Sequence, residues 1–192
     1  MDRMLIVVAG PAGVGKTEIG RQLASRLPAA LLDKDALTGE FVMALLKEYG
    51  HDPDDRESKL YQELIRPLEY AQLERVAFDN LAAGQNVLMV APYGHELSDP
   101  GWREDLLSRA AAHGARLEVI WVRCNPSIMR RRLADRAASR DRWKQSHWDR
   151  YLTTIKWDQP PVFAHRMIDN DLDETELAPI AQIDEIVLDL RR

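Results

Sequence analysis

Eight consecutive residues near the start of the chain combine glycines with a lysine and a threonine in a pattern that can wrap phosphate groups. They are Gly10, Pro11, Ala12, Gly13, Val14, Gly15, Lys16 and Thr17. Glycine allows backbone angles that other residues rarely adopt, so that successive N–H groups can surround an anion. The lysine can reach the outer phosphates of ATP and act in catalysis, and the threonine hydroxyl can ligate Mg²⁺. The spacing G-x-x-x-x-G-K-T therefore predicts a site for ATP and Mg²⁺, and a glycine-rich turn without a ligand is the alternative.

Two carboxylates, Asp33 and Asp35, directly follow a short apolar run at residues 29–32. Residues two apart in an extended segment face the same way, and ligands of open α/β sheets bind beyond the carboxyl ends of the strands. We therefore expect both near the outer phosphate, where one can hold Mg²⁺ through water and the other can accept the proton of an attacking hydroxyl. The alternative is that one aspartate caps the following helix and the other is a solvated turn residue. Lys34 is expected to point the other way and to be structural or solvated.

A basic stretch at residues 130–144 places Arg132, Arg136 and Arg140 four residues apart, on one face of an expected helix. Like charges at this spacing destabilise a helix by a few tenths of a kcal/mol per pair, and an anionic partner would offset that cost. Arginine suits phosphate because its planar fork can bind it with two hydrogen bonds. We predict that Arg132 binds ATP, Arg136 acts in catalysis and Arg140 contacts the second substrate. The alternative is a solvated helix in which neighbouring acids pair with the arginines.

Apolar runs and helical patterns alternate along the chain. Apolar runs predict strands at residues 4–9, 29–32, 87–90 and 117–122, with a short fifth strand at 166–168. Helical spacing predicts helices at 16–27, within 33–49, over 58–83 as one or two helices, at 102–113, from 126 onward and at 181–190. Strands that alternate with helices predict an α/β fold with a parallel sheet and helices on both faces. No linker is visible, so a single domain is expected over residues 1–192.

The composition limits the classes of function. A net charge of −5 argues against a general nucleic-acid or membrane binder, and neither partner is expected. The single cysteine, Cys124, allows no internal disulfide, and no signal segment is visible, so a cytoplasmic location is expected. The histidines are scattered without metal-ligand spacing, and we expect no zinc site.

The glycine-rich loop and the Asp-x-Asp that follows it resemble those of the small-molecule kinases of the P-loop superfamily. This group contains shikimate kinase, gluconate kinase and chloramphenicol phosphotransferase. The resemblance is good over residues 4–35 and looser afterwards. It implies a three-layer α/β/α fold with a five-stranded parallel sheet in the order 2-3-1-4-5, and an arginine-rich helical lid at about residues 130–150. It also implies that Asp33 belongs to the metal side and Asp35 to the acceptor hydroxyl.

Three further residues are assigned by position or by this resemblance. Tyr93 follows the third strand at the same edge of the sheet, where it either contacts the substrate or packs in the core. Arg66 begins an Arg-Pro-Leu-Glu run similar to the Arg-x-x-Glu on the substrate-binding helix of shikimate kinase, and a surface arginine is the alternative. Asn170 follows the last strand, similar to the loop that lines adenine in many P-loop kinases, and a simple Asx turn explains it as well. We therefore expect Arg66 and Tyr93 at the substrate and Asn170 at ATP.

These features together predict an ATP-dependent phosphotransferase that moves the γ-phosphate of ATP to a hydroxyl of a small molecule, a metabolite or an antibiotic. One alternative is a nucleotide kinase or a sugar-nucleotide kinase of the zeta-toxin type. Another is a regulatory module that binds ATP and hydrolyses it slowly or not at all, although the aspartates and arginines speak against it. The sequence identifies neither the acceptor nor the oligomeric state, which is left as monomer or homodimer.

Overall fold

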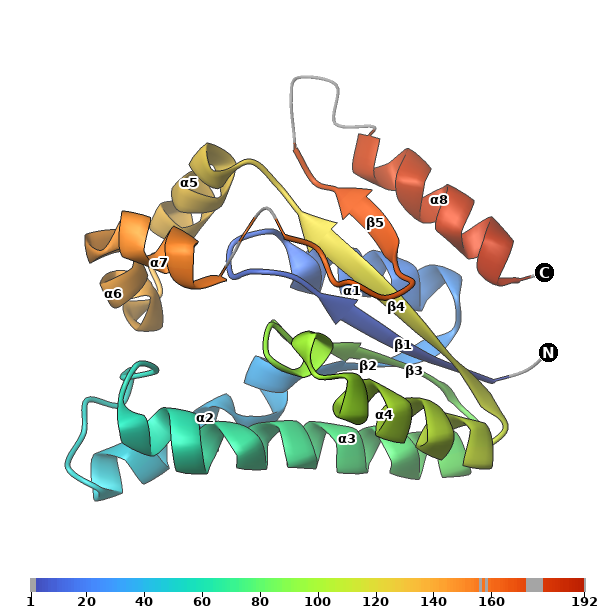
Figure 1. The fold of residues 1–192 in the computed structure, drawn as a ribbon, viewed down its shortest axis with the longest axis horizontal. Coiled ribbons are helices and arrows are strands. Elements are labelled where there is room, and N and C mark those ends of the chain that lie inside the picture. The colour runs from blue at the N-terminus through green and yellow to red at the C-terminus, as the bar shows by residue number, and fades with distance from the viewer. Residues whose placement is uncertain (1–2, 156, 158, 172–177, 192) are drawn as a thin grey trace.

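A five-stranded sheet forms the middle layer of the protein (Figure 1). The computed structural model describes residues 3–155, 157, 159–171 and 178–191. The strands are β1 (Arg3–Ala9), β2 (Ala29–Asp33), β3 (Asn86–Val90), β4 (Ala115–Arg123) and β5 (Arg166–Asp169). Their order is β2-β3-β1-β4-β5, and all neighbouring pairs run parallel. The predicted fold class and strand order are therefore confirmed.

Helices cover both faces of the sheet. The α-helices of the described residues are α1 (Lys16–Arg26), α2 (Lys34–Glu48), α3 (Arg66–Ala82), α4 (Pro100–Ala112), α5 (Pro126–Arg136), α6 (Arg142–Ser146), α7 (Trp148–Ile155) and α8 (Ala178–Leu190). α1 and α8 pack on one face, and α3 and α4 pack on the other. Within the described residues, no helix is both long enough and apolar enough to cross a membrane.

The central strand β1 is buried on both of its faces. Ile6 and Val8 join the core formed with α1 and α8, whereas Leu5 and Val7 join the core formed with α3 and α4. Successive side chains of a strand point to opposite faces, so a strand covered on both sides needs a continuous apolar run. This requirement explains the unbroken apolar sequence that leads into the glycine-rich loop.

α2 follows β2 and packs in a small core of its own. Its Val42 and Leu46 are buried against Tyr61 and Ile65 in a small core separate from the two cores of the sheet. Tyr61–Ile65 is a π-helical segment that leads directly into α3. The helical pattern over residues 58–83 is therefore two elements, and α3 begins at Arg66, directly before Pro67.

The segment for which the resemblance implies a lid, about residues 130–150, lies within α5, α6 and α7 rather than one long helix, and these three helices are called the lid below. α5 ends at Arg136 because Ala137 adopts a left-handed backbone with φ of 49°. Arg140 lies beyond this end, in a 3-10 turn at Ser139–Asp141. The prediction that Arg132, Arg136 and Arg140 share one helix face is therefore wrong.

A buried carboxylate explains why the chain folds back after α5. The side chain of Asp141 is 1% exposed and binds both Arg136 and Lys144. From α6, Nε2 of Gln145 donates to the carbonyl oxygen of Leu133 at 2.9 Å, in the last turn of α5. These contacts satisfy groups that a helix end leaves open, and they fix α6 against α5.

Candidate active site

The phosphate-binding loop, residues 10–17, connects β1 to α1 and turns at three glycines. Gly10, Gly13 and Gly15 have φ angles of 139°, 89° and 91°, which residues with side chains rarely adopt. A Cβ on Gly10 would lie 2.2 Å from the carbonyl oxygen of Val122, and one on Gly15 would lie 2.4 Å from Nδ2 of Asn170. At these two positions glycine is required both by the backbone angle and by the space.

The loop presents open N–H groups at the N-terminus of α1. The amides of residues 13–17 donate to no acceptor within the part of the chain that the structure describes. The amide of Ala12 differs, since it donates to the hydroxyl of Tyr151 at 3.1 Å. Open amides and the positive end of a helix together form a site that suits an anion.

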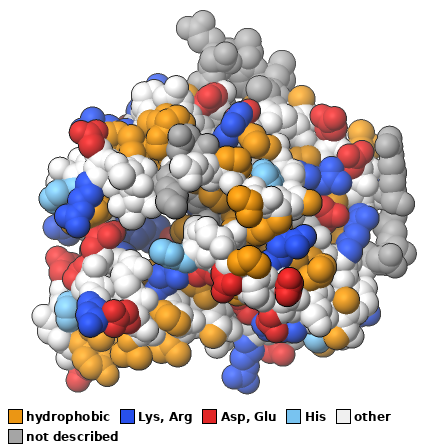
Figure 2. Space-filling model, viewed as in Figure 1, with side chains coloured by type: hydrophobic (Ala, Val, Ile, Leu, Met, Phe, Trp, Pro, Cys, Tyr) orange, Lys and Arg blue, Asp and Glu red, His pale blue; other side chains and the backbone are white. Residues whose placement is uncertain are grey.

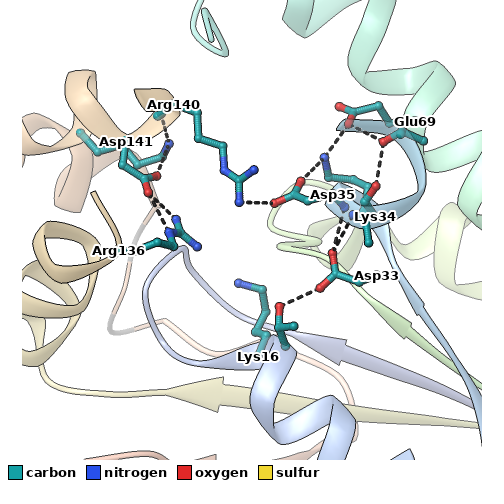
Figure 3. Close-up of polar contacts among 12 residues, drawn as sticks. Lys16, Asp33, Lys34, Asp35, Glu69, Arg136, Arg140 and Asp141 are labelled. Atoms are coloured by element: carbon teal, nitrogen blue, oxygen red, sulfur yellow. Dashed lines mark hydrogen bonds and ion pairs between the residues drawn. The ribbon is translucent and has the colours of Figure 1, made fainter. Parts of the chain in front are cut away.

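Lys16 begins α1 and folds back over the loop. Its Nζ donates to the carbonyl oxygen of Pro11 at 2.7 Å, and Figure 3 shows the ammonium pointing toward the space below the lid. Burial lowers the pKa of Lys16 to about 8, and the nearby charges of Asp35 and Asp33 oppose that shift. Lys16 is therefore mainly protonated at neutral pH, which is the form that attracts phosphate.

Asp33 makes two kinds of contact where β2 ends. Its Oδ2 accepts a hydrogen bond from Oγ1 of Thr17 at 2.7 Å. Its Oδ1 accepts from the amides of Asp35 and Ala36 at 2.9 and 3.3 Å, which caps α2. Asp33 is therefore both a helix cap and a neighbour of the loop threonine. A hydroxyl and a carboxylate side by side in the cleft are the oxygen ligands that Mg²⁺ prefers, so these residues fit the predicted ion.

Asp35 faces the cleft with one cation at each carboxylate oxygen (Figure 3). Nζ of Lys34 lies 3.0 Å from Oδ1, and a guanidinium nitrogen of Arg140 lies 3.3 Å from Oδ2. Burial raises the pKa of Asp35, but Lys34 and Arg140 outweigh this effect and hold the pKa well below its usual range. Asp35 is therefore ionised at neutral pH and can accept a hydrogen bond from a hydroxyl.

Lys34 lies beneath Asp35 and is held by Glu69 of α3. Its Nζ is 2.7 Å from Oε1 of Glu69, and only 6% and 3% of the two side chains are exposed. Glu69 also accepts hydrogen bonds from Thr38 at 2.8 Å and from Tyr61 at 2.7 Å. A buried ion pair is tolerated when its remaining hydrogen-bonding capacity is used in this way. Lys34 has the structural role that the sequence allowed, but its contact with Asp35 was not expected.

The predicted arginines all line the cleft, although they do so from different elements. Arg132 contacts the loop from α5. Arg136 binds the buried carboxylate of Asp141, and Arg140 approaches Asp35 from the opposite wall. The structure therefore gathers cationic groups over the loop, with the last of them facing the Asp35 carboxylate.

The structure places the remaining predicted site residues, Arg66, Tyr93 and Asn170, in three different surroundings. Arg66 lines the cleft, where it pairs with Glu96 at 2.7 Å. Tyr93 is fully buried and packs edge-on against Tyr70, with ring centroids 5.2 Å apart. The structure corrects the substrate-binding prediction for Tyr93, because a left-handed backbone with φ of 55° turns its ring into the core. Asn170 is buried behind the loop, and its Nδ2 donates to a loop carbonyl.

Several residues that line the cleft carried no sequence signal. They include Arg56, Tyr61, His95 and Lys144. They belong to the loop after α2, the π-helical segment, the turn after β3 and the short helix α6. No local pattern marks them, because each reaches the cleft only through the way the fold brings distant segments together.

The cleft has a volume of about 880 Å³ and lies between the lid and the carboxyl ends of the strands. Figure 2 shows the molecule hollowed between the lid and the lower helices, with Lys and Arg side chains inside the hollow. This volume is toward the upper end of the range for small-molecule sites. The cleft can therefore hold a nucleotide together with a small second molecule.

The sheet order and the loop define a kinase-like fold of the P-loop NTPase class. A family model described as "AAA domain" matches residues 5–156, and the chain belongs to that family. No curated protein matches the sequence.

Solved structures share the fold at low sequence identity. A sugar kinase from Janibacter sp. HTCC2649 is 17% identical, with a TM-score of 0.61 over 98% of this chain and 95% of that chain. A gluconokinase from Sinorhizobium meliloti 1021 is 16% identical, with a TM-score of 0.56 over 99% and 96%. A shikimate kinase from Bacteroides thetaiotaomicron is 16% identical, with a TM-score of 0.53 over 98% and 99%. The resemblance to this group is thereby confirmed at the level of the fold.

Proposed function

We propose that the protein is an ATP-dependent phosphotransferase that moves the γ-phosphate of ATP to a hydroxyl group of a small molecule. The observation that carries the proposal is the position of the Asp35 carboxylate. It lies 3.3 Å from Arg140 across the cleft, close to the loop lysine and next to the helix cap at Asp33. Binding of a nucleotide alone does not need a carboxylate at this position. Transfer to a hydroxyl does, because a carboxylate can orient the hydroxyl and accept its proton.

The groups around the cleft divide the work of phosphoryl transfer. The open amides of the loop and the ammonium of Lys16 would hold the phosphates of ATP. Thr17 and Asp33 would hold Mg²⁺, which supplies neutralisation of the charge on the outer phosphates. Arg136 and Arg140 would stabilise the charge on the phosphoryl group as it moves. Positioning and electrostatic stabilisation then supply most of the rate acceleration.

Asp35 would orient the acceptor and then take its proton. The acceptor oxygen forms a bond to the γ-phosphorus while the bond from that phosphorus to the bridging oxygen of ADP breaks. The lowered pKa makes Asp35 a weak base before the reaction. The proton therefore passes to Asp35 only late, when bonding to phosphorus has made the hydroxyl acidic.

The acceptor would occupy the wall of the cleft beyond Asp35. Tyr61, Arg66 and His95 line this region, which combines aromatic surface with hydrogen-bond donors. Such a lining suits a polar molecule that carries hydroxyl groups.

A phosphorylation screen tests the proposal. The protein is incubated with ATP, Mg²⁺ and a panel of hydroxylated metabolites, antibiotics, nucleoside monophosphates and sugar nucleotides, and products are found by the mass of one added phosphoryl group. We expect a hydroxylated molecule outside the nucleotide classes to react, and a Lys16→Met variant to give no product. Transfer only to a nucleotide or sugar nucleotide would contradict the proposed acceptor class. Tight binding of Mg²⁺-ADP with no product from any member would favour a regulatory module.

A further inference from the structure

A carbonyl group of the phosphate-binding loop is held by two side chains from distant parts of the chain. The carbonyl oxygen of Val14 accepts a hydrogen bond from Nδ2 of Asn170 at 2.7 Å and from a guanidinium nitrogen of Arg132 at 3.3 Å. Asn170 follows β5, and Arg132 belongs to α5. A carbonyl oxygen has two lone pairs, and here both have a donor. The orientation of this one peptide group is therefore fixed from outside the loop.

The two donors also hold each other in place. Arg132 donates to the carbonyl oxygen of Asn170 at 3.0 Å, and the amide of Asn170 donates to the carbonyl oxygen of Arg123 at 2.8 Å. Asn170 is only 7% exposed, so water competes little for these hydrogen bonds. Gly15 permits the close approach, since a Cβ there would lie 2.4 Å from Nδ2 of Asn170. The contacts form a closed clamp on the Val14 carbonyl.

The orientation of the Val14 carbonyl decides where the next amide points. In a trans peptide the C=O and the N–H point in opposite directions, and the described backbone has no cis peptide bond. The amide of Gly15 therefore points away from Asn170, and Gly15 itself lines the cleft. We infer that Asn170 and Arg132 are positioning residues that aim the Gly15 amide at the phosphates of the bound nucleotide. This inference rests on the nucleotide-binding part of the proposed function.

The inference changes the role expected for Asn170. The resemblance to P-loop kinases implied a position beside adenine, with a simple Asx turn as the alternative. Asn170 is not among the described residues that line the cleft, and its Nδ2 donates to the loop. A residue that acts through the loop should alter the affinity for phosphates whether or not a base is attached. A residue that contacts the base should alter the affinity only for ligands that carry one.

Two probes separate these roles. Isothermal titration calorimetry measures the binding of Mg²⁺-ADP and of Mg²⁺-tripolyphosphate to the wild-type chain and to Asn170→Ala. We expect both probes to bind about tenfold more weakly to the variant, which is the effect of losing one well-placed hydrogen bond. A loss for ADP alone would show a contact with the base and overturn the inference. Unchanged affinity for both probes would overturn it as well.

Gln182→Leu is the matched control. Gln182 reaches from α8 to the backbone of Asp169, one residue before Asn170, with hydrogen bonds of 2.9 and 3.0 Å. We expect this variant to be less stable but to bind both probes within about twofold of the wild type. An equal loss of affinity in Gln182→Leu would mean that any loosening after β5 weakens binding, which would overturn the inference.

A second variant keeps the test decisive if the first does not fold. If Asn170→Ala does not fold, Asn170→Ser is measured instead, because the serine side chain is too short for its hydroxyl to reach the carbonyl oxygen of Val14. The affinities for the two probes then support or overturn the inference in the same way as for Asn170→Ala. A folded wild type that binds neither probe would instead contradict the proposed function.

Discussion

The two halves of the cleft are held together in different ways. The nucleotide half is built from backbone groups that hydrogen bonds to distant side chains fix in place, at the Val14 carbonyl and the Ala12 amide. The acceptor half is built from charged side chains that pair with one another, such as Arg140 with Asp35. One half therefore presents open N–H groups, whereas the other presents charges that already have partners.

This difference implies different responses to ligands. Fixed backbone groups are ready for phosphate and lose little entropy on binding. The pair between Arg140 and Asp35 has side chains that are 32% and 47% exposed, and ion pairs with such exposure contribute little stability. A phosphoryl group can therefore draw Arg140 away, and an acceptor hydroxyl can take its place at Asp35. We expect variants of the nucleotide half to change nucleotide affinity and variants of the acceptor half to change turnover.

Apart from a change at Asp35 itself, replacing Arg140 should give the largest of these effects. In Arg140→Gln the charge that faces the moving phosphoryl group is lost, and we expect kcat for the acceptor found by the screen to fall by about 10²–10³-fold. The Kd of Mg²⁺-ADP should stay within about twofold, because the loop amides are untouched. Steady-state kinetics and calorimetry on the same preparation measure the two quantities.

Arg142→Gln is the control for this variant. Arg142 is also a lid arginine and also faces an aspartate, Asp54, but at 3.9 Å and with 71% of its side chain exposed. Its kcat should match that of the wild type within about twofold. Equal losses in the two variants would mean that lid charge acts generally rather than at Asp35.

Removing the buried acid of the acceptor half should chiefly lower stability. Glu69→Gln removes the buried counter-charge of the Lys34 ammonium and leaves only the half-exposed carboxylate of Asp35 beside it. We expect the free energy of unfolding to fall by about 3 kcal/mol. The exposed pair between Lys59 and Glu63 provides the comparison, since Glu63→Gln should cost less than about 1 kcal/mol. Chemical denaturation measures both variants. A similar loss of unfolding free energy in Glu69→Gln and Glu63→Gln would contradict a buried ion pair that holds Lys34 in place.

The smallest effect is expected at Tyr151. Tyr151→Phe keeps the ring in its buried place but removes the oxygen that accepts from the Ala12 amide. We expect Mg²⁺-ADP to bind about fivefold more weakly, the worth of about 1 kcal/mol, with little change in kcat. A fall in kcat at unchanged nucleotide affinity would place Tyr151 in the acceptor half and break the division between the halves.

Much of the nucleotide half could be predicted from the sequence because its signals are local. The loop lies in eight consecutive residues between an apolar run and a helix, and its glycines are needed wherever the backbone makes that turn. Asp33 was recognisable because it ends β2, whose carboxyl end must lie at the same edge of the sheet, and the same reasoning found Asp35 of the acceptor half two residues later. The part that sequence reasoning missed is the clamp on Val14, since it joins residues that only the folded sheet brings together.

The acceptor half could be predicted far less well because it depends on tertiary contacts. The four-residue spacing of the arginines predicted one helix, but the left-handed backbone at Ala137 ends α5 and moves Arg140 to a separate turn. Tyr93 follows β3 at the predicted edge of the sheet, yet its ring is buried in the core. The pairing of Lys34 with Glu69 joins α2 to α3, and neither residue carries a local signal for it.

The Asp35→Asn variant gives the clearest test that one half of the cleft binds the nucleotide and the other half acts in transfer. Phosphoryl transfer and nucleotide binding are both measured in this variant. This substitution keeps the shape of the side chain and removes the negative charge that would orient the hydroxyl and take its proton. With the acceptor identified by the screen, we expect transfer to fall by about 10²–10⁴-fold while the Kd of Mg²⁺-ADP stays within about twofold. Full transfer by Asp35→Asn on that acceptor would contradict the account.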